Sequence, residues 1–120
     1  TMVTLYDKIG EKRLKQIIER FYDKIYQSPI AHLFQNDKNE IASKQIAFIT
    51  QFLGGPLIYS ELHGHPRMRA RHLPHAIDNT AKDIWLDCMF DAINEVIEDK
   101  NLAIELFDCF PRVAQHMVNQ

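Results

Sequence analysis

Residues 54–79 hold four of the six histidines of the chain, together with three prolines and three arginines. Prolines at this spacing interrupt a long helix, and neither the helical nor the strand period of apolar residues persists, so we expect a long irregular segment. A loop of this length in a compact domain is usually functional or disordered. Its apolar residues argue against disorder, and the simplest interpretation is a segment wrapped around a group that is not protein.

The histidines of this segment are His63, His65, His72 and His75, and imidazole is a common metal ligand. They could cluster around zinc or nickel, but no cysteine lies nearby and the i, i+2 spacing matches no common zinc motif. For any one of them, an exposed loop position is the ordinary explanation. A third interpretation is that one histidine faces an apolar pocket and is the axial ligand of a haem iron.

The arginines of the segment alternate along the chain at Arg67, Arg69 and Arg71. Either they are solvated, or they neutralise carboxylates, for which the guanidinium fork is well shaped.

Three polar-capable side chains, Tyr22, Gln45 and Trp85, lie on helical faces that are otherwise apolar. A buried amide or hydroxyl without a partner costs about 1–3 kcal/mol, so each needs a hydrogen bond or a ligand. For Tyr22 and Trp85 the ordinary explanation is a core aromatic bonded to a carbonyl, whereas leucine would suit the position of Gln45 better. Together, three such groups from three helices suggest a polar constellation inside an apolar pocket.

Amphipathic helices are expected to position these groups. A capping box at Thr4 opens a short helix that ends by Gly10, and an i, i+3, i+4, i+7 series predicts a helix of roughly residues 11–27. Ser28 and Pro29 begin a short turn. A third helix then carries Gln45 and stops at residues 54–56.

After the irregular segment, Thr80 is expected to cap a fourth helix, which carries Trp85. The last helix covers residues 102–118, with a kink at Pro111. No segment shows strand alternation, so the chain is predicted to be all-α. Short connections make each helix pair antiparallel, and two crossing pairs form a two-layer helical sandwich.

Length and composition favour one domain over residues 1–120, with 46% hydrophobic residues. The net charge of −2 gives no reason to expect a nucleic-acid or membrane partner. We expect a cytoplasmic protein without a signal peptide, with Cys88 and Cys109 as free buried thiols. Thr1 precedes Met2 and is expected to be left over from cloning.

Several short motifs occur in order along nearly the whole chain. They are Phe21-Tyr22, Gln51-Phe-Leu-Gly-Gly-Pro, Tyr59-Ser-Glu, Gly64-His-Pro-Arg-Met-Arg-Ala-Arg-His72-Leu-Pro, Asp83-Ile-Trp-Leu-Asp-Cys-Met89 and His116-Met-Val-Asn. Each is weak alone, but their joint occurrence at this spacing resembles the truncated haemoglobins of the second group. The resemblance implies a shortened globin: a two-over-two helical sandwich that holds haem b noncovalently, with a long irregular proximal loop.

The resemblance also implies residue roles. His72 is the proximal iron ligand, Tyr22 lies on the distal side, and the Trp85 indole N–H points at the iron-bound ligand. Gln45 falls at a distal position that is Gln or Leu in the family. The position where many globins place a distal histidine holds Ile41, so no histidine is available there.

Other positions are implied to contact the haem or depart from the family pattern. The haem contacts are Phe34, Ile41, Phe48, Tyr59, Trp85 and Met89, with Arg69 and Arg71 expected at the propionates. His75 stands where the family often has phenylalanine, which leaves a second possible ligand. A family Gly-Gly motif is reduced to Gly10-Glu11, which affects an early turn and nothing chemical.

Ferrous haem on His72 would leave one position open for O2, NO or CO. Oxygen bound there acquires superoxide-like charge, which hydrogen-bond donors in a dry pocket stabilise. We therefore expect slow oxygen release, under which simple oxygen transport to respiration is not expected.

Two other functions remain open. One is a haem redox enzyme with nitric-oxide dioxygenase or peroxidase-like activity and an unidentified reductase, which multiple turnover of nitric oxide or peroxide would demonstrate. The other is a haem-free interaction or metal-binding module, for which the purified protein would be colourless. A monomer and a homodimer are both compatible with the sequence.

Overall fold

The computed structural model describes residues 2–35, 37–65 and 75–120, and these residues form helices joined by turns, with no strand among them. The helices are α1 (Leu5–Ile9), α2 (Glu11–Tyr26), the 3₁₀ turn η1 (Ala31–Leu33), α3 (Lys38–Phe52), α4 (Ile58–His63), α6 (Asn79–Val96), α7 (Lys100–Phe107) and α8 (Pro111–Met117). The expected all-α class is confirmed.

The first two helices form as their local sequence predicts. The Thr4 hydroxyl accepts from the Asp7 backbone N–H at 3.0 Å, and the Asp7 carboxylate accepts from the Thr4 N–H at 3.0 Å, which is a complete capping box. In α2 the apolar series forms one buried face. Its buried residues are Leu14, Ile17, Ile18, Phe21, Tyr22 and Ile25.

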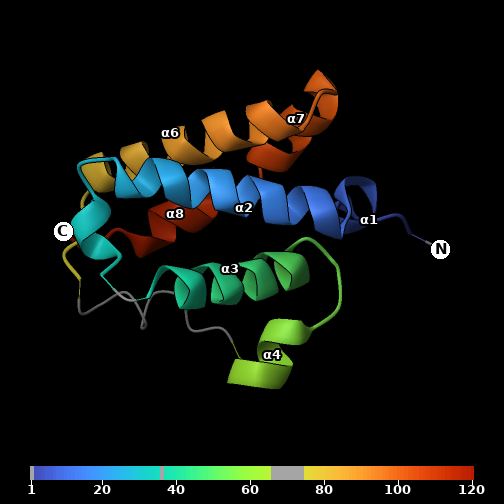
Figure 1. Ribbon diagram of the computed structural model, residues 1–120, viewed down its shortest axis with the longest axis horizontal. Coiled ribbons are helices and arrows are strands. Elements are labelled where there is room, and N and C mark those ends of the chain that lie inside the picture. Colours follow the sequence, from blue (N-terminus) through green and yellow to red (C-terminus); the bar gives the residue numbers. More distant parts are fainter. Residues whose placement is uncertain (1, 36, 66–74) are drawn as a thin grey trace.

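Two antiparallel helix pairs make up the two layers (Figure 1). Helices α2 and α3 run in opposite directions, and α6 and α8 do the same. Helix α2 packs along α6, and α8 also packs against α6, so α6 joins the two layers. This is the two-over-two arrangement expected from the sequence.

Helix α4 corrects the expectation that residues 54–79 begin as irregular chain. Its six residues are fixed from outside, because the Gln51 amide of α3 donates to the Ser60 hydroxyl at 2.8 Å and accepts from the Ser60 N–H at 2.9 Å. The Tyr59 ring packs edge-on against Phe48 of α3, with ring centroids 5.7 Å apart. The early part of the segment is therefore a helix docked on α3.

Two helix boundaries also differ from expectation. Helix α6 begins two residues early, because the Asp78 carboxylate accepts from the Ala81 N–H at 2.8 Å and caps it, whereas Thr80 lies inside the helix. Pro111 does not kink one long helix. It begins α8 as the first helical residue, after α7 has ended at Phe107.

The glycine pair at the end of α3 is required by close packing on the N-terminal segment. A Cβ on Gly54, whose φ is +95°, would lie 2.8 Å from Thr4 side-chain atoms, and a Cβ on Gly55 would lie 2.8 Å from the Tyr6 ring. By contrast, Glu11 in place of the second glycine of the early family motif introduces no backbone strain, because Glu11 is an ordinary first residue of α2.

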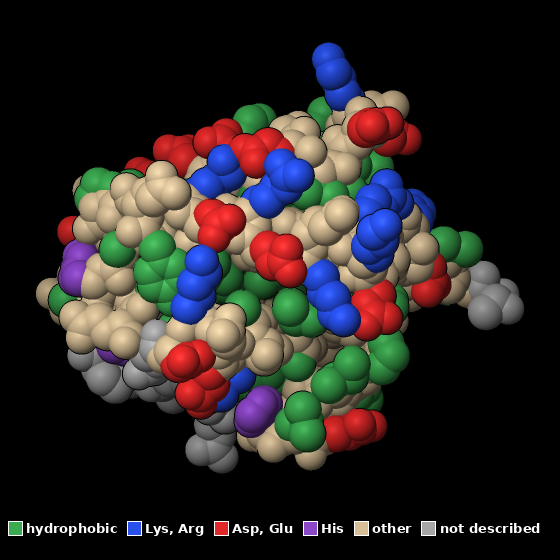
Figure 2. Space-filling view, viewed as in Figure 1, with side chains coloured by type: hydrophobic (Ala, Val, Ile, Leu, Met, Phe, Trp, Pro, Cys, Tyr) green, Lys and Arg blue, Asp and Glu red, His purple; other side chains and the backbone are tan. Residues whose placement is uncertain are grey.

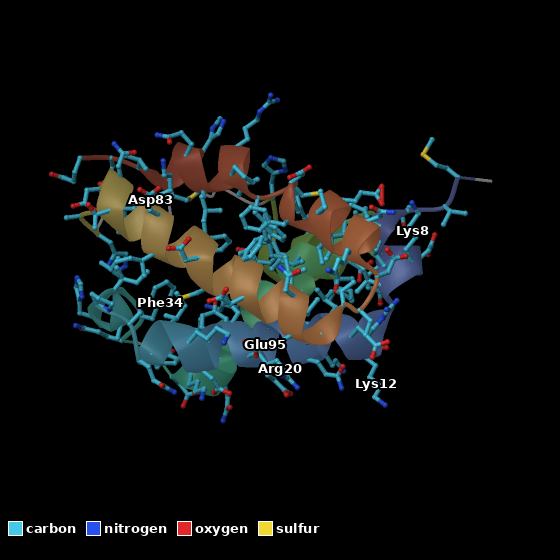
Figure 3. The ribbon with its side chains drawn as sticks, turned by 90° about the horizontal axis from the view of Figure 1, so that it is seen from above. Lys8, Lys12, Arg20, Phe34, Asp83 and Glu95 are labelled. Atoms are coloured by element: carbon cyan, nitrogen blue, oxygen red, sulfur yellow. The ribbon has the colours of Figure 1, made fainter. Side chains whose placement is uncertain are left out.

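The surface carries charges of both signs, interspersed across the face shown in Figure 2. Glu95 of α6 pairs with Lys24 and, at 3.3 Å, with Arg20 of α2, where the two helices run side by side (Figure 3).

Cys88 is buried and Cys109 is half-buried, and both are free; burial raises the pKa of each thiol. Among the described residues, no helix is long and apolar enough to cross a bilayer.

Candidate functional site

A cavity of about 430 Å³ lies between α3 on one side and α6 and α8 on the other, next to the C-terminal end of α2. Its walls are mostly aromatic and aliphatic, and its volume lies in the range of pockets that hold small molecules and cofactors. The lining residues are Tyr22, Ile30, Leu33, Phe34, Ile41, Lys44, Gln45, Phe48, Ile49, Phe52, Tyr59, His75, Ile77, Ala81, Lys82, Trp85, Phe110, Val113, Ala114 and Met117.

The three polar-capable side chains singled out in the sequence all line this cavity. Tyr22 comes from α2, Gln45 from α3 and Trp85 from α6. No hydrogen bond joins the Tyr22 hydroxyl, the Gln45 amide or the Trp85 indole N–H to another residue that the structure describes. Three elements thus bring three donors to one apolar space, where a bound group with acceptor atoms would satisfy them.

Burial keeps Tyr22 in its neutral form. The residue is 1% exposed, and loss of solvation raises the pKa of its phenol, with a smaller contribution from Tyr26. A neutral phenol keeps its proton and remains a hydrogen-bond donor.

Aromatic contacts fix the orientation of two of the donors, Tyr22 and Trp85. Phe21 lies edge-on to both neighbours, with ring centroids 4.9 Å from Tyr22 and 5.0 Å from Trp85. The Trp85 ring also lies 6.0 Å from Phe110, and Phe34 packs edge-on to Tyr22 at 6.0 Å. Phe34 lies toward the end of the molecule where α6 begins (Figure 3). Rings held on several sides preorganise their polar groups.

Most of the other expected contact residues also lie at the cavity. Phe34, Ile41, Phe48 and Tyr59 line it. Met89 does not: it is 1% exposed and belongs to the core cluster that holds α6 against α2.

The expected iron ligand and propionate partners lie outside the described residues. These are His72, Arg69 and Arg71, as well as Arg67. Of the other histidines in the segment, His75 lines the cavity, whereas His63 and His65 are exposed. In the part of the chain that the structure describes, no three His, Cys, Asp or Glu residues gather into a metal site.

Sequence reasoning missed the wall built by α8 and the two lysines. Val113, Ala114 and Met117 of α8 face the cavity, and apolar residues on a helix face indicate burial but not a binding site. Lys44 and Lys82 bring cations to the lining. Lys44 pairs with Glu40 at 3.4 Å, and the Lys82 ammonium donates to the Gln115 amide oxygen at 2.9 Å.

These features fit a haem. A flat apolar macrocycle needs an apolar, largely aromatic space, which the cavity supplies. Its carboxylates need cations, and Lys44 and Lys82 are present. A ligand on its iron needs donors, and three face the cavity with no partner among the described residues.

The sequence matches a known protein family over nearly its whole length. Residues 4–119 match the family model described as bacterial-like globin. The chain is 45% identical over 116 residues to the group 2 truncated haemoglobin YjbI of Bacillus subtilis, covering 96% of this chain and 88% of that protein.

Solved structures agree with this match. The truncated oxygen-avid haemoglobin from Bacillus subtilis superposes with a TM-score of 0.92 at 43% identity, covering 98% of this chain and 100% of the other. The group II truncated haemoglobin from Bacillus anthracis gives a TM-score of 0.94 at 37% identity, covering 99% and 98%.

Proposed function

The chain belongs to the bacterial-like globin family as a group II truncated haemoglobin, and from that premise we propose that it binds O2 and other diatomic ligands, such as NO and CO, in the cavity between α3 and α6. The cofactor is haem b, which supplies the iron that coordinates the ligand. We further propose that residues 1–120 form one domain that works in the cytoplasm.

His72 is the proposed iron ligand. It stands in the Arg-His-Leu-Pro motif that carries the family resemblance. His75 is the alternative, because it lines the cavity three positions later. Arg69 and Arg71 are the proposed partners of the propionates, and Lys44 and Lys82 add cations at the cavity.

Tyr22, Gln45 and Trp85 are proposed to stabilise the bound ligand. Each offers a donor from a different helix, and negative charge that gathers on the ligand strengthens hydrogen bonds to these donors. The phenol of Tyr22 keeps its proton because burial raises its pKa.

The apolar walls keep the site dry. Phe34, Phe48 and Phe110 line the cavity and exclude water, which would otherwise compete for the three donors and screen their dipoles. The chain's own residues thus bind and orient the ligand in a medium where each hydrogen bond counts for more than in water.

One observation carries this proposal: three donors from three helices face one aromatic cavity and have no hydrogen-bond partner among the described residues. The test is ligand binding by the purified protein, reconstituted with haemin where necessary. We expect carbon monoxide and oxygen each to change the absorption spectrum of the dithionite-reduced, then desalted, protein at one ligand per chain. A protein that takes up haemin but binds neither gas would refute the proposal.

A further inference from the structure

Asn119, the last residue of the motif His116-Met-Val-Asn119, has no part in the function proposed so far. It lies against the segment that leads into α6, as Figure 1 shows at the C-terminal end of the chain. The Asn119 backbone N–H donates to the Ile77 carbonyl at 2.9 Å, and the Ile77 N–H donates to the Asn119 side-chain oxygen at 2.9 Å. Asn119 and Ile77 are therefore joined in both directions.

A third bond uses the other half of the same amide. The Asn119 side-chain nitrogen donates to the His75 carbonyl at 2.8 Å. One side chain thus satisfies an N–H and a carbonyl two residues apart, across 42 and 44 positions of sequence. An amide suits this geometry because it offers an acceptor and a donor side by side.

The segment held in this way is a wall of the cavity. His75 and Ile77 both line it, and Ile77 is 9% exposed. Residues 75–77 are not helical, so their backbone groups have no intrahelical partners. Asp78 anchors one end of the segment by capping α6. Asn119 bonds the His75 carbonyl and both backbone groups of Ile77.

Helix α8 lines the same cavity and ends two residues before Asn119. Met117, the last residue of α8, lines the cavity two positions before Asn119. The Gln115 side chain of α8 accepts from Lys82 of α6 at 2.9 Å. The bonds of Asn119 therefore close the gap between the end of α8 and the entry to α6.

We propose that Asn119 is a positioning residue, a C-terminal latch that holds the His75–Ile77 wall of the cavity in place and so retains the cofactor. The inference rests on the proposed function, because it assigns the latch to the cavity where the haem binds. In the sequence, His75 follows His72 by three positions, so the latch acts close along the chain to the proposed iron ligand.

The test begins with cofactor retention, measured as transfer of haem from the holoprotein to excess apomyoglobin at neutral pH. Asn119→Ala removes the side-chain bonds to Ile77 and His75 and should speed haem loss roughly tenfold to thirtyfold, the effect of two neutral hydrogen bonds. Asn119→Asp keeps the acceptor for the Ile77 N–H but loses the donor to His75, so its rate should fall in between. Gln120→Ala, one exposed residue further on, should match the wild type.

A second readout separates a latch from general destabilisation. Amide hydrogen exchange of the holoprotein should accelerate at least tenfold in the peptide covering residues 75–78 of Asn119→Ala, with α2 and α3 unchanged. Uniform acceleration over all helices would show a merely structural role and overturn the inference.

The two proposals fail in different ways. Wild-type protein that never takes up haemin would refute the proposed function itself. Wild-type protein that holds haem, together with Asn119→Ala and Asn119→Asp variants that lose it at the wild-type rate, would overturn the latch alone.

Discussion

Replacing Trp85 by phenylalanine removes one donor from the cavity and little else. The Trp85 ring packs between Phe21 and Phe110, with centroids 5.0 and 6.0 Å away, and a phenyl ring retains much of that contact. The indole N–H has no partner among the described residues, so its loss leaves no protein group unsatisfied there. The substitution therefore measures the hydrogen bond to the ligand.

The expected magnitude follows from the strength of such a bond. A hydrogen bond to a charged group contributes about 1.5–3 kcal/mol, and 1.4 kcal/mol is a tenfold change in an equilibrium constant. Oxygen should dissociate from Trp85→Phe roughly ten to a hundred times faster than from the wild type. Tyr22→Phe removes a donor in the same way and should act in the same direction.

The assay is stopped-flow displacement of oxygen by carbon monoxide from the ferrous protein. Tyr26→Phe is the matched control, because it deletes the same hydroxyl one helical turn along α2 from Tyr22, at a residue that does not line the cavity. Its oxygen dissociation rate should equal that of the wild type. Wild-type rates for both Trp85→Phe and Tyr22→Phe would refute the assignment of donors.

Three further predictions concern stability. The Tyr26 hydroxyl is buried without a hydrogen-bond partner among the described residues, so Tyr26→Phe should raise the free energy of unfolding by about 1 kcal/mol in urea titrations. A decrease would show that the hydroxyl is satisfied. Gly55→Ala should lower the same quantity by about 1–3 kcal/mol, because its Cβ would lie 2.8 Å from the Tyr6 ring and 2.9 Å from the Thr50 carbonyl. Burial raises the pKa of Tyr22 above its unfolded value of about 10, so its contribution to stability is full below pH 10 and declines at higher pH. The free energy of unfolding of the apoprotein should therefore fall more steeply above pH 10 in the wild type than in Tyr22→Phe, and equal slopes would contradict the shift.

The long helices were predictable because their signals are local. The apolar series of α2 and the capping box at Thr4 each act within a few residues, and both appear in the structure as expected. Helix α4 depends instead on Gln51, nine residues before Ser60, and no periodicity in six residues between prolines indicates it. Asp78 and Thr80 are both good caps by type, and the hydrogen bond to Ala81 decides between them.

The site divides in the same way. Tyr22, Gln45 and Trp85 were marked by polar groups on apolar faces, and the structure brings all three to one cavity. The wall of α8 carried no such mark, because alanine, valine and methionine on a helix face predict burial and not what they are buried against. The latch at Asn119 depends on two segments more than 40 positions apart, a pairing that one sequence does not reveal.

The measurement that tests the central claim most directly is an absorption and resonance Raman comparison of the ferrous, ligand-free wild type with His72→Ala and His75→Ala. We expect a haem spectrum with an iron–histidine stretching band in the wild type and in His75→Ala, and loss or change of that band in His72→Ala. An unchanged band in His72→Ala that disappears in His75→Ala would move the iron ligand to the residue that lines the cavity. A wild type that remains colourless after haemin is added would contradict haem binding itself.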